Sequence, residues 1–90
     1  MKIVTVCGMG VGTSALLKFN ADKVLDSLDL EARVVATDVA SVRKVSRDAQ
    51  IILTTPDLKK QLTGLRAEII LIKSVSDLEE ISAKLSKALL

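Results

Sequence analysis

The sequence predicts an α/β fold in which a four-stranded parallel sheet is covered by helices on both faces. Three observations predict this class. Four short, β-branched and apolar runs alternate with segments of helical periodicity. The runs are apolar on both faces, as strands buried between two layers of helices are. No repeat, low-complexity tract or linker interrupts the pattern, so residues 1–90 are expected to form a single domain.

The expected elements follow one another in the order βαβαβαβα. The first strand is Lys2–Val6, a β-branched run that ends at Cys7 and a glycine-rich stretch. A helix is expected over Ser14–Leu28, because its apolar residues recur with a helical period. The stripe they form consists of Leu17, Ala21, Val24, Leu25 and Leu28. The second strand is Ala32–Thr37, and a short helix is expected across Ala40–Val45.

The second half of the chain repeats the alternation. Gln50–Thr54 is the third strand. Pro56 then suits the first position of a helix that runs to about Leu62, because a proline there loses no helical hydrogen bond. Glu68–Ile72 is the fourth strand.

The last helix is expected to begin within residues 74–79. Ser76 and Glu79 have the spacing of a capping box, in which each side chain satisfies a backbone N–H of the other residue. The apolar residues beyond this point form one stripe that should face the core, namely Leu78, Ile81, Leu85, Ala88 and Leu89.

Right-handed crossovers leave few arrangements for such a chain, and the expected strand order is 2-1-3-4, as in flavodoxin-like and Rossmann-like folds. Ligands of these sheets bind beyond the carboxyl ends of the strands, at the switch point between strands one and three. Cys7 and its glycine-rich loop lie there, with Thr54, Thr55 and Pro56 across from them. The cysteine is therefore expected at the functional edge of the sheet.

Composition excludes several classes of function. The net charge of +2 comes from mixed charges without a basic block, and Phe19 is the only aromatic residue, so no nucleic-acid partner is expected. No apolar run approaches the roughly 18 residues of a membrane helix. The residues after Met1 lack the long apolar region of a secretory signal. A free, cytoplasmic chain without direct membrane insertion is expected. With one cysteine and no histidine, a self-contained Cys-His protease and most zinc sites are excluded, and we expect no metal or cofactor.

The loop after the first strand contains the residues that could bind an anion or react with it. A turn from a strand into a helix exposes backbone N–H groups that, with the helix dipole, attract anions. Three glycines let the backbone wrap closely and adopt positive φ, two hydroxyls can donate to an oxyanion, and the thiol of Cys7 is a nucleophile. The expected phosphate-binding residues are Gly8, Met9, Gly10, Val11, Gly12, Thr13 and Ser14.

Other interpretations of this loop stay open. A lone cysteine can be a small apolar core residue, and the glycines and hydroxyls can serve only packing and helix capping. A Walker A loop would need a lysine between Gly12 and Thr13, and the sequence has none. A phosphatase of the Cys-x5-Arg type would need an arginine at the position that Thr13 occupies. A nucleotide- or dinucleotide-binding module remains possible, with Asp38 as the ribose-binding acid.

The segment Lys2 to Ser14, which reads Lys-Ile-Val-Thr-Val-Cys-Gly-Met-Gly-Val-Gly-Thr-Ser, resembles the IIB component of the bacterial sugar phosphotransferase system (PTS), particularly its ascorbate-type branch. The order of elements and the length agree over the whole chain. The resemblance implies that Cys7 accepts a phosphoryl group from a phosphohistidine on a IIA partner. It implies that Cys7 then donates this group to a sugar, L-ascorbate or a related one, translocated by a membrane IIC permease. A regulatory domain of the same fold is the remaining alternative.

One further expectation concerns docking of the partners. On the first helix, Phe19 falls almost opposite the core stripe and on the same side as Ala15. With Met9 and Val11 on the loop, these residues are expected to form the patch on which a partner lands. Single exposed apolar residues are also common without a function, and the loop after the third strand could instead cover Phe19.

Overall fold

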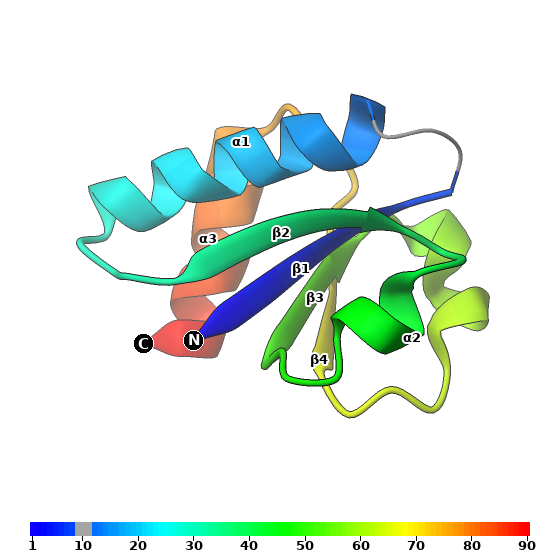
Figure 1. Ribbon diagram of the computed structural model, residues 1–90. Coiled ribbons are helices and arrows are strands. Elements are labelled where there is room, and N and C mark those ends of the chain that lie inside the picture. Colours follow the sequence, from blue (N-terminus) through cyan, green and yellow to red (C-terminus); the bar gives the residue numbers. More distant parts are fainter. Residues whose placement is uncertain (9–11) are drawn as a thin grey trace.

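The computed structural model, which describes residues 1–8 and 12–90, confirms the predicted architecture (Figure 1). Its sheet has four parallel strands in the order β2-β1-β3-β4. The strands are β1 (Lys2–Cys7), β2 (Arg33–Asp38), β3 (Ile51–Thr54) and β4 (Glu68–Leu71). Strand β1 lies in the middle of the sheet, so its carboxyl end, at Cys7, is at the switch point between β2 and β3.

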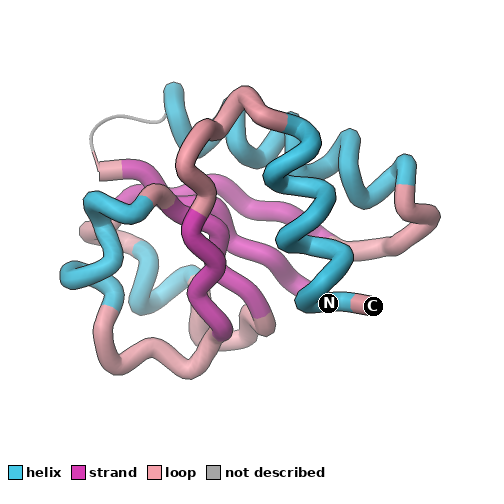
Figure 2. The backbone as a smooth tube through the Cα atoms, turned by 180° about the vertical axis from the view of Figure 1, so that it is seen from behind, coloured by secondary structure: helices cyan, strands magenta, loops and turns pink. Residues whose placement is uncertain are grey.

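Helical segments cover both faces of the sheet, as Figure 2 shows from behind. Helices α1 (Gly12–Ser27) and α3 (Leu78–Leu89) share one hydrophobic cluster with one face. The short helix α2 (Val42–Val45) and the 3-10 helix η1 (Pro56–Leu62) share a second cluster with the other face. The sheet is thus buried between two layers, which explains why its strands carry continuous apolar runs.

Alternation along β1 separates these two cores. Ile3 belongs to the cluster beneath α1 and α3, whereas Val4 and Val6 belong to the cluster beneath α2 and η1. The side chains alternate because successive residues of a strand point to opposite faces. All three are buried because helical segments cover both faces. Thr5 points to the α1 face, where its Oγ1 donates a hydrogen bond to the carbonyl of Ser14 at 2.9 Å.

The amino end of α3 corrects one prediction. Asp77, not Ser76, caps the helix: Asp77 Oδ1 accepts hydrogen bonds from the backbone N–H groups of Glu79 and Glu80, at 3.0 and 3.1 Å. Since the helix begins one residue later than a cap at Ser76 requires, the capping box does not form. Leu78, expected in the core stripe, is 42% exposed.

Two other elements differ from expectation in detail. Helix α1 begins at Gly12, two residues before the predicted start, and its buried residues include four of the five predicted, while Leu28 is half-buried just beyond its end. The segment after β3 is a 3-10 helix, with Pro56 in its first turn and Leu58 and Leu62 buried. No helix in the part of the chain that the structure describes is long and apolar enough to cross a membrane.

Candidate active site

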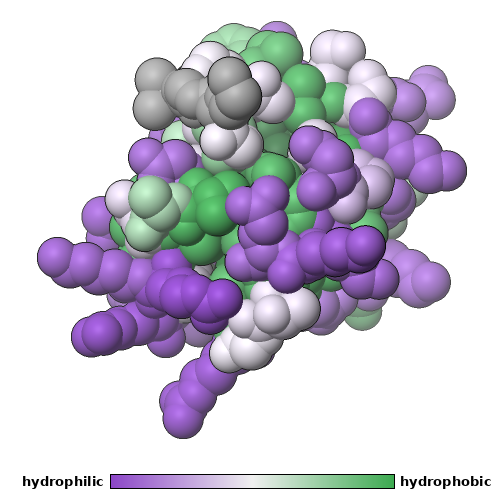
Figure 3. Space-filling model, turned by 90° about the vertical axis from the view of Figure 1, so that its right-hand side faces the viewer, coloured by the Kyte–Doolittle hydropathy of each residue, from purple (hydrophilic) through white to green (hydrophobic). Residues whose placement is uncertain are grey.

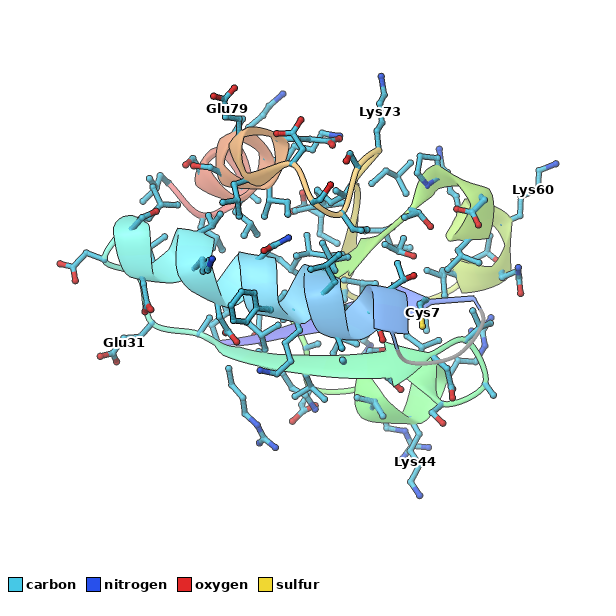
Figure 4. The ribbon with its side chains drawn as sticks, turned by 90° about the horizontal axis from the view of Figure 1, so that it is seen from above. Cys7, Glu31, Lys44, Lys60, Lys73 and Glu79 are labelled. Atoms are coloured by element: carbon cyan, nitrogen blue, oxygen red, sulfur yellow. The ribbon has the colours of Figure 1, made fainter. Side chains whose placement is uncertain are left out.

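Cys7 lies at the last position of β1, beside Asp38 at the end of β2. Figure 4 shows its sulfur at the amino end of α1. The side chain is only 3% exposed. Its thiol donates a hydrogen bond to Ser14 Oγ at 3.3 Å, and Ser14 is itself fully buried in the first turn of α1. The thiol therefore has a defined position between the sheet and the helix.

Buried threonines fix the backbone on both sides of this cysteine. Thr5 ties β1 to Ser14 through the hydrogen bond already described. Thr54, at the end of β3, donates from Oγ1 to the carbonyl of Val6 at 3.2 Å. The carboxyl ends of the two central strands and the start of α1 are thus held together by side-chain hydrogen bonds in a buried setting, where such bonds are most costly to break.

A hollow of about 250 Å³ opens at this edge of the sheet. It is lined by Cys7, Gly8, Thr13, Thr55 and Asp57. The first turn of α1, the positive end of the helix dipole, borders it. In Figure 3, which views the molecule from this side, an apolar area is bordered by hydrophilic side chains. The hollow combines a nucleophile, a helix amino end and two hydroxyl groups, an arrangement that can hold an anion beside sulfur.

The structure brings together some of the predicted phosphate-binding residues. Gly8 and Thr13 line the hollow, and Gly12 begins α1 next to it. Ser14 contacts the sulfur from the core side. The predictions for Met9, Gly10 and Val11 lie outside the described residues.

The two described glycines of the loop, Gly8 and Gly12, do not have positive φ. Among the residues that the structure describes, Gly64 is the glycine with positive φ. At position 8 there is little room for a side chain, because a Cβ there would lie 3.0 Å from Cδ2 of the buried Leu58. At Gly12 a Cβ would meet no atom of the described residues within 4 Å. A side chain at position 8 would therefore crowd Leu58 of η1.

Sequence reasoning missed Asp57, the charged residue among those that line the hollow. It follows Pro56 in the first turn of η1, and the prediction that the segment after β3 faces Cys7 could have found it. Asp38, considered as a ribose-binding acid, instead accepts a hydrogen bond from the backbone N–H of Ser41 at 2.8 Å. This contact closes the turn after β2 and gives the carboxylate a structural role.

The described members of the predicted docking patch are both exposed. Phe19 is 57% exposed on the outer side of α1, and Ala15 lies one turn before it. The ammonium group of Lys23 lies 4.7 Å from the centre of the Phe19 ring, within the range of a cation–π interaction. The segment after β3 therefore does not bury Phe19.

Comparison with known proteins identifies the family. The profile of the family described as "PTS system, Lactose/Cellobiose specific IIB subunit" matches residues 2–87. A protein of Mycoplasma pneumoniae described as "Ascorbate-specific PTS system EIIB component" is 30% identical over 90 residues, which cover 99% of this chain and 95% of the relative. Since both matches span nearly the whole chain, the protein belongs to the PTS IIB family, the sugar phosphotransferase components of that system.

Proposed function

We propose that Cys7 is the phosphoryl carrier of this IIB component. It accepts the group from a phosphohistidine of a IIA partner and donates it to a sugar that a membrane IIC permease translocates. One observation carries the proposal: Cys7 lies at the carboxyl end of the central strand, in a hollow that the start of α1 borders. A nucleophile next to oriented backbone amides is what transfer of a phosphoryl dianion needs.

The transfer takes two displacements at phosphorus. In the first, the sulfur of Cys7 attacks, an S–P bond forms and the P–N bond to the partner's histidine breaks, while the thiol proton passes to the imidazole that leaves. In the second, a sugar hydroxyl oxygen attacks the phosphocysteine, an O–P bond forms, the S–P bond breaks and the hydroxyl proton is released. That proton returns the sulfur to the thiol form. Because the chain contains no histidine, the phosphohistidine must belong to the partner.

The surroundings of Cys7 suit a carrier better than a phosphatase. The described residues that line the hollow include no arginine, and Thr13 stands six positions after Cys7, where a cysteine phosphatase has its arginine. A guanidinium group at that point stabilises the transition state of hydrolysis. Its absence from these positions lets the phosphocysteine persist until an acceptor hydroxyl arrives.

We propose L-ascorbate or a related sugar as the acceptor. The Mycoplasma pneumoniae relative is described as ascorbate-specific and covers nearly the whole chain. The matching family is described by lactose and cellobiose. The acceptor is therefore tested by offering all three sugars with the matching permease membranes and measuring which is phosphorylated.

Mass spectrometry tests the carrier role. The protein is incubated with phosphoenolpyruvate, the general PTS proteins and a IIA partner, and its intact mass is measured. We expect the mass of one phosphoryl group, localised to the peptide that contains Cys7. Incubation without the IIA partner is the control and should leave the mass unchanged. A phosphoryl group on any other residue would contradict the proposal.

A further inference from the structure

A second hollow, of about 320 Å³, lies away from Cys7. It is formed by two segments that lead into the amino ends of β3 and β4. These segments lie at the edge of the sheet opposite to the carboxyl end of β1 (Figure 1). Its lining consists of Arg43, Ser46, Arg47, Gly64, Leu65 and Arg66. Three of the four arginines of the chain therefore meet in one concavity.

No acid neutralises these three arginines within residues 1–8 and 12–90. The salt bridges of this part of the chain all use lysine. Asp48, the neighbour of Arg47 in sequence, pairs instead with Lys2, whose Nζ lies 2.7 Å from Asp48 Oδ1. That hydrogen bond lowers the pKa of Asp48, which keeps its charge directed toward Lys2. The hollow thus gathers positive charge without a counter-charge.

The three arginines are exposed, and one of them is tied to the loop that precedes β4. Arg43 and Arg47 are four residues apart on the turn of α2 and its extension, a spacing at which like charges repel. Arg43 is held by a hydrogen bond from Nη2 to the carbonyl of Thr63 at 3.1 Å. Gly64 has a φ of 82°, a conformation that favours glycine, and a Cβ there would lie 4.0 Å from Nη1 of Arg43. Arg66, two residues later, lines the same hollow.

We infer that this arginine hollow binds a phosphate ester. Guanidinium groups present planar pairs of donors that match the oxygens of phosphate, and Arg43, Arg47 and Arg66 supply three such groups around one space. Three uncompensated charges suit a phosphate with several peripheral oxygens better than a single carboxylate. The volume is at the lower end of the range for small-molecule sites, about 300 to 1,000 Å³. The bound group is the phosphate of a soluble ester or of a lipid headgroup.

Titration with glycerol phosphate, followed by backbone amide NMR, tests this inference on the full chain. We expect the amides of Ser46, Gly64 and Leu65 to shift. The double variant Arg43→Gln/Arg47→Gln should weaken binding at least about tenfold, because two charge-assisted contacts are lost. Arg66→Gln alone should weaken it less. Because no phosphoryl transfer is measured, the result is independent of the carrier role of Cys7.

A matched control separates a built site from general attraction between charges. Lys44→Gln/Lys60→Gln also removes two positive charges, and both lysines project away from the body of the protein (Figure 4). This variant should bind within about twofold of the wild type. Equal losses in the two double variants would overturn the inference, since binding would then follow net charge alone.

Vesicle sedimentation identifies the source of the phosphate. Vesicles that contain phosphatidylglycerol are compared with vesicles of phosphatidylcholine alone. Arginine-dependent binding to the anionic vesicles without binding of glycerol phosphate assigns the hollow to lipid headgroups, and the reverse result assigns it to soluble esters. Binding of neither probe would overturn the inference.

Discussion

At the scale of single residues, the position of the Cys7 sulfur depends on Ser14. Cys7 is 3% exposed, and its thiol donates a hydrogen bond to the hydroxyl of Ser14, which is fully buried. A nucleophile that must meet phosphorus in line gains rate from a fixed position, and displacement by about 1 Å can cost about a hundredfold. Ser14 is therefore proposed as a positioning residue for the sulfur.

Ser14→Ala should slow phosphorylation of Cys7 about tenfold or more while the melting temperature changes little, because the buried methylene group is kept and one hydroxyl is lost. Stopped-flow alkylation measures the rate at which the Cys7 thiol reacts at each pH. A purely structural role of Ser14 would leave this rate profile unchanged. Ser27→Ala is the matched control, since the Oγ of Ser27 donates to the carbonyl of Val24 at the far end of α1. Equal rates in all three proteins would contradict the positioning role.

Asp57 sets a second residue-scale expectation. Its carboxylate shares the hollow with Cys7, so it repels a dianion bound to the sulfur. Asp57→Asn should shift the equilibrium between phospho-IIA and phospho-IIB toward phospho-IIB by roughly two- to tenfold. The equilibrium is read from the phosphorylated fractions on gels that separate the charge forms.

The control for this shift is Asp26→Asn, an exposed acid at the other end of α1. It removes the same charge at a distance where salt screens the interaction. An unchanged equilibrium in Asp57→Asn, or an equal shift in both variants, would show that Asp57 does not act on the phosphocysteine.

At the scale of elements, the strands were predictable and the ends of the helices were less so. Four apolar runs gave the strands because both faces of the sheet are covered. The spacing of Ser76 and Glu79 predicts a cap at Ser76. In the structure Asp77 caps α3, and Glu80 accepts a hydrogen bond from the loop before the helix. Spacing alone does not show which of several polar side chains the tertiary structure uses.

The site was predictable where it depends on the order of elements and not where it depends on packing. Cys7 at the end of the first strand followed from the order of elements, because parallel sheets place their sites at strand carboxyl ends. Asp57 was missed because it lies fifty residues later in sequence and reaches the hollow only through the fold. The role of Gly8 was also beyond the sequence, since its closeness to Leu58 depends on how η1 packs.

Helix α1 carries the expectation about docking. Phe19 is 57% exposed, and its loss should cost little stability. Phe19→Ser should weaken binding of the IIA partner and slow phosphorylation of Cys7, because an apolar contact is removed from the proposed patch. Binding is measured by calorimetry and stability by thermal melts.

Leu78→Ser is the matched control for docking, because Leu78 is 42% exposed on α3 and outside the proposed patch. It should leave the affinity for IIA unchanged. Unchanged affinity in Phe19→Ser, or a large fall in its melting temperature with transfer intact, would contradict a docking role for this residue.

At the scale of the whole molecule, Glu80 joins the loop after β4 to helix α3. Its oxygens accept hydrogen bonds from the N–H groups of Lys73 and Ser74, at 2.7 and 2.9 Å, and contact Lys84 Nζ at 2.8 Å. The hydrogen bond from Lys73, followed by that from Lys84, lowers the pKa of Glu80 from 4.5 to about 2. The charged form therefore holds the loop after β4 to α3.

A lowered pKa in the folded state has a definite sign for stability. The contribution of Glu80 is fully present above pH 4.5, its unfolded value, and is lost as the pH falls toward about 2. Glu80→Gln should lower the melting temperature at pH 7 and flatten its dependence on pH between these values. Glu79→Gln, an exposed neighbour, is the control and should keep the wild-type slope. An equal slope in Glu80→Gln would show that other carboxylates govern acid unfolding.

The central claim is that phosphate travels through the sulfur of Cys7. Its most direct test is the relay from phosphoenolpyruvate to sugar, measured with the complete PTS and either wild-type protein or Cys7→Ser. The substitution changes one atom in a buried site, so the fold should persist, and a serine hydroxyl is not ionised near neutral pH. We expect a folded variant with no phosphoprotein and no sugar phosphate above the level without IIB. Sugar phosphorylation by Cys7→Ser at a rate comparable to the wild type would contradict the account.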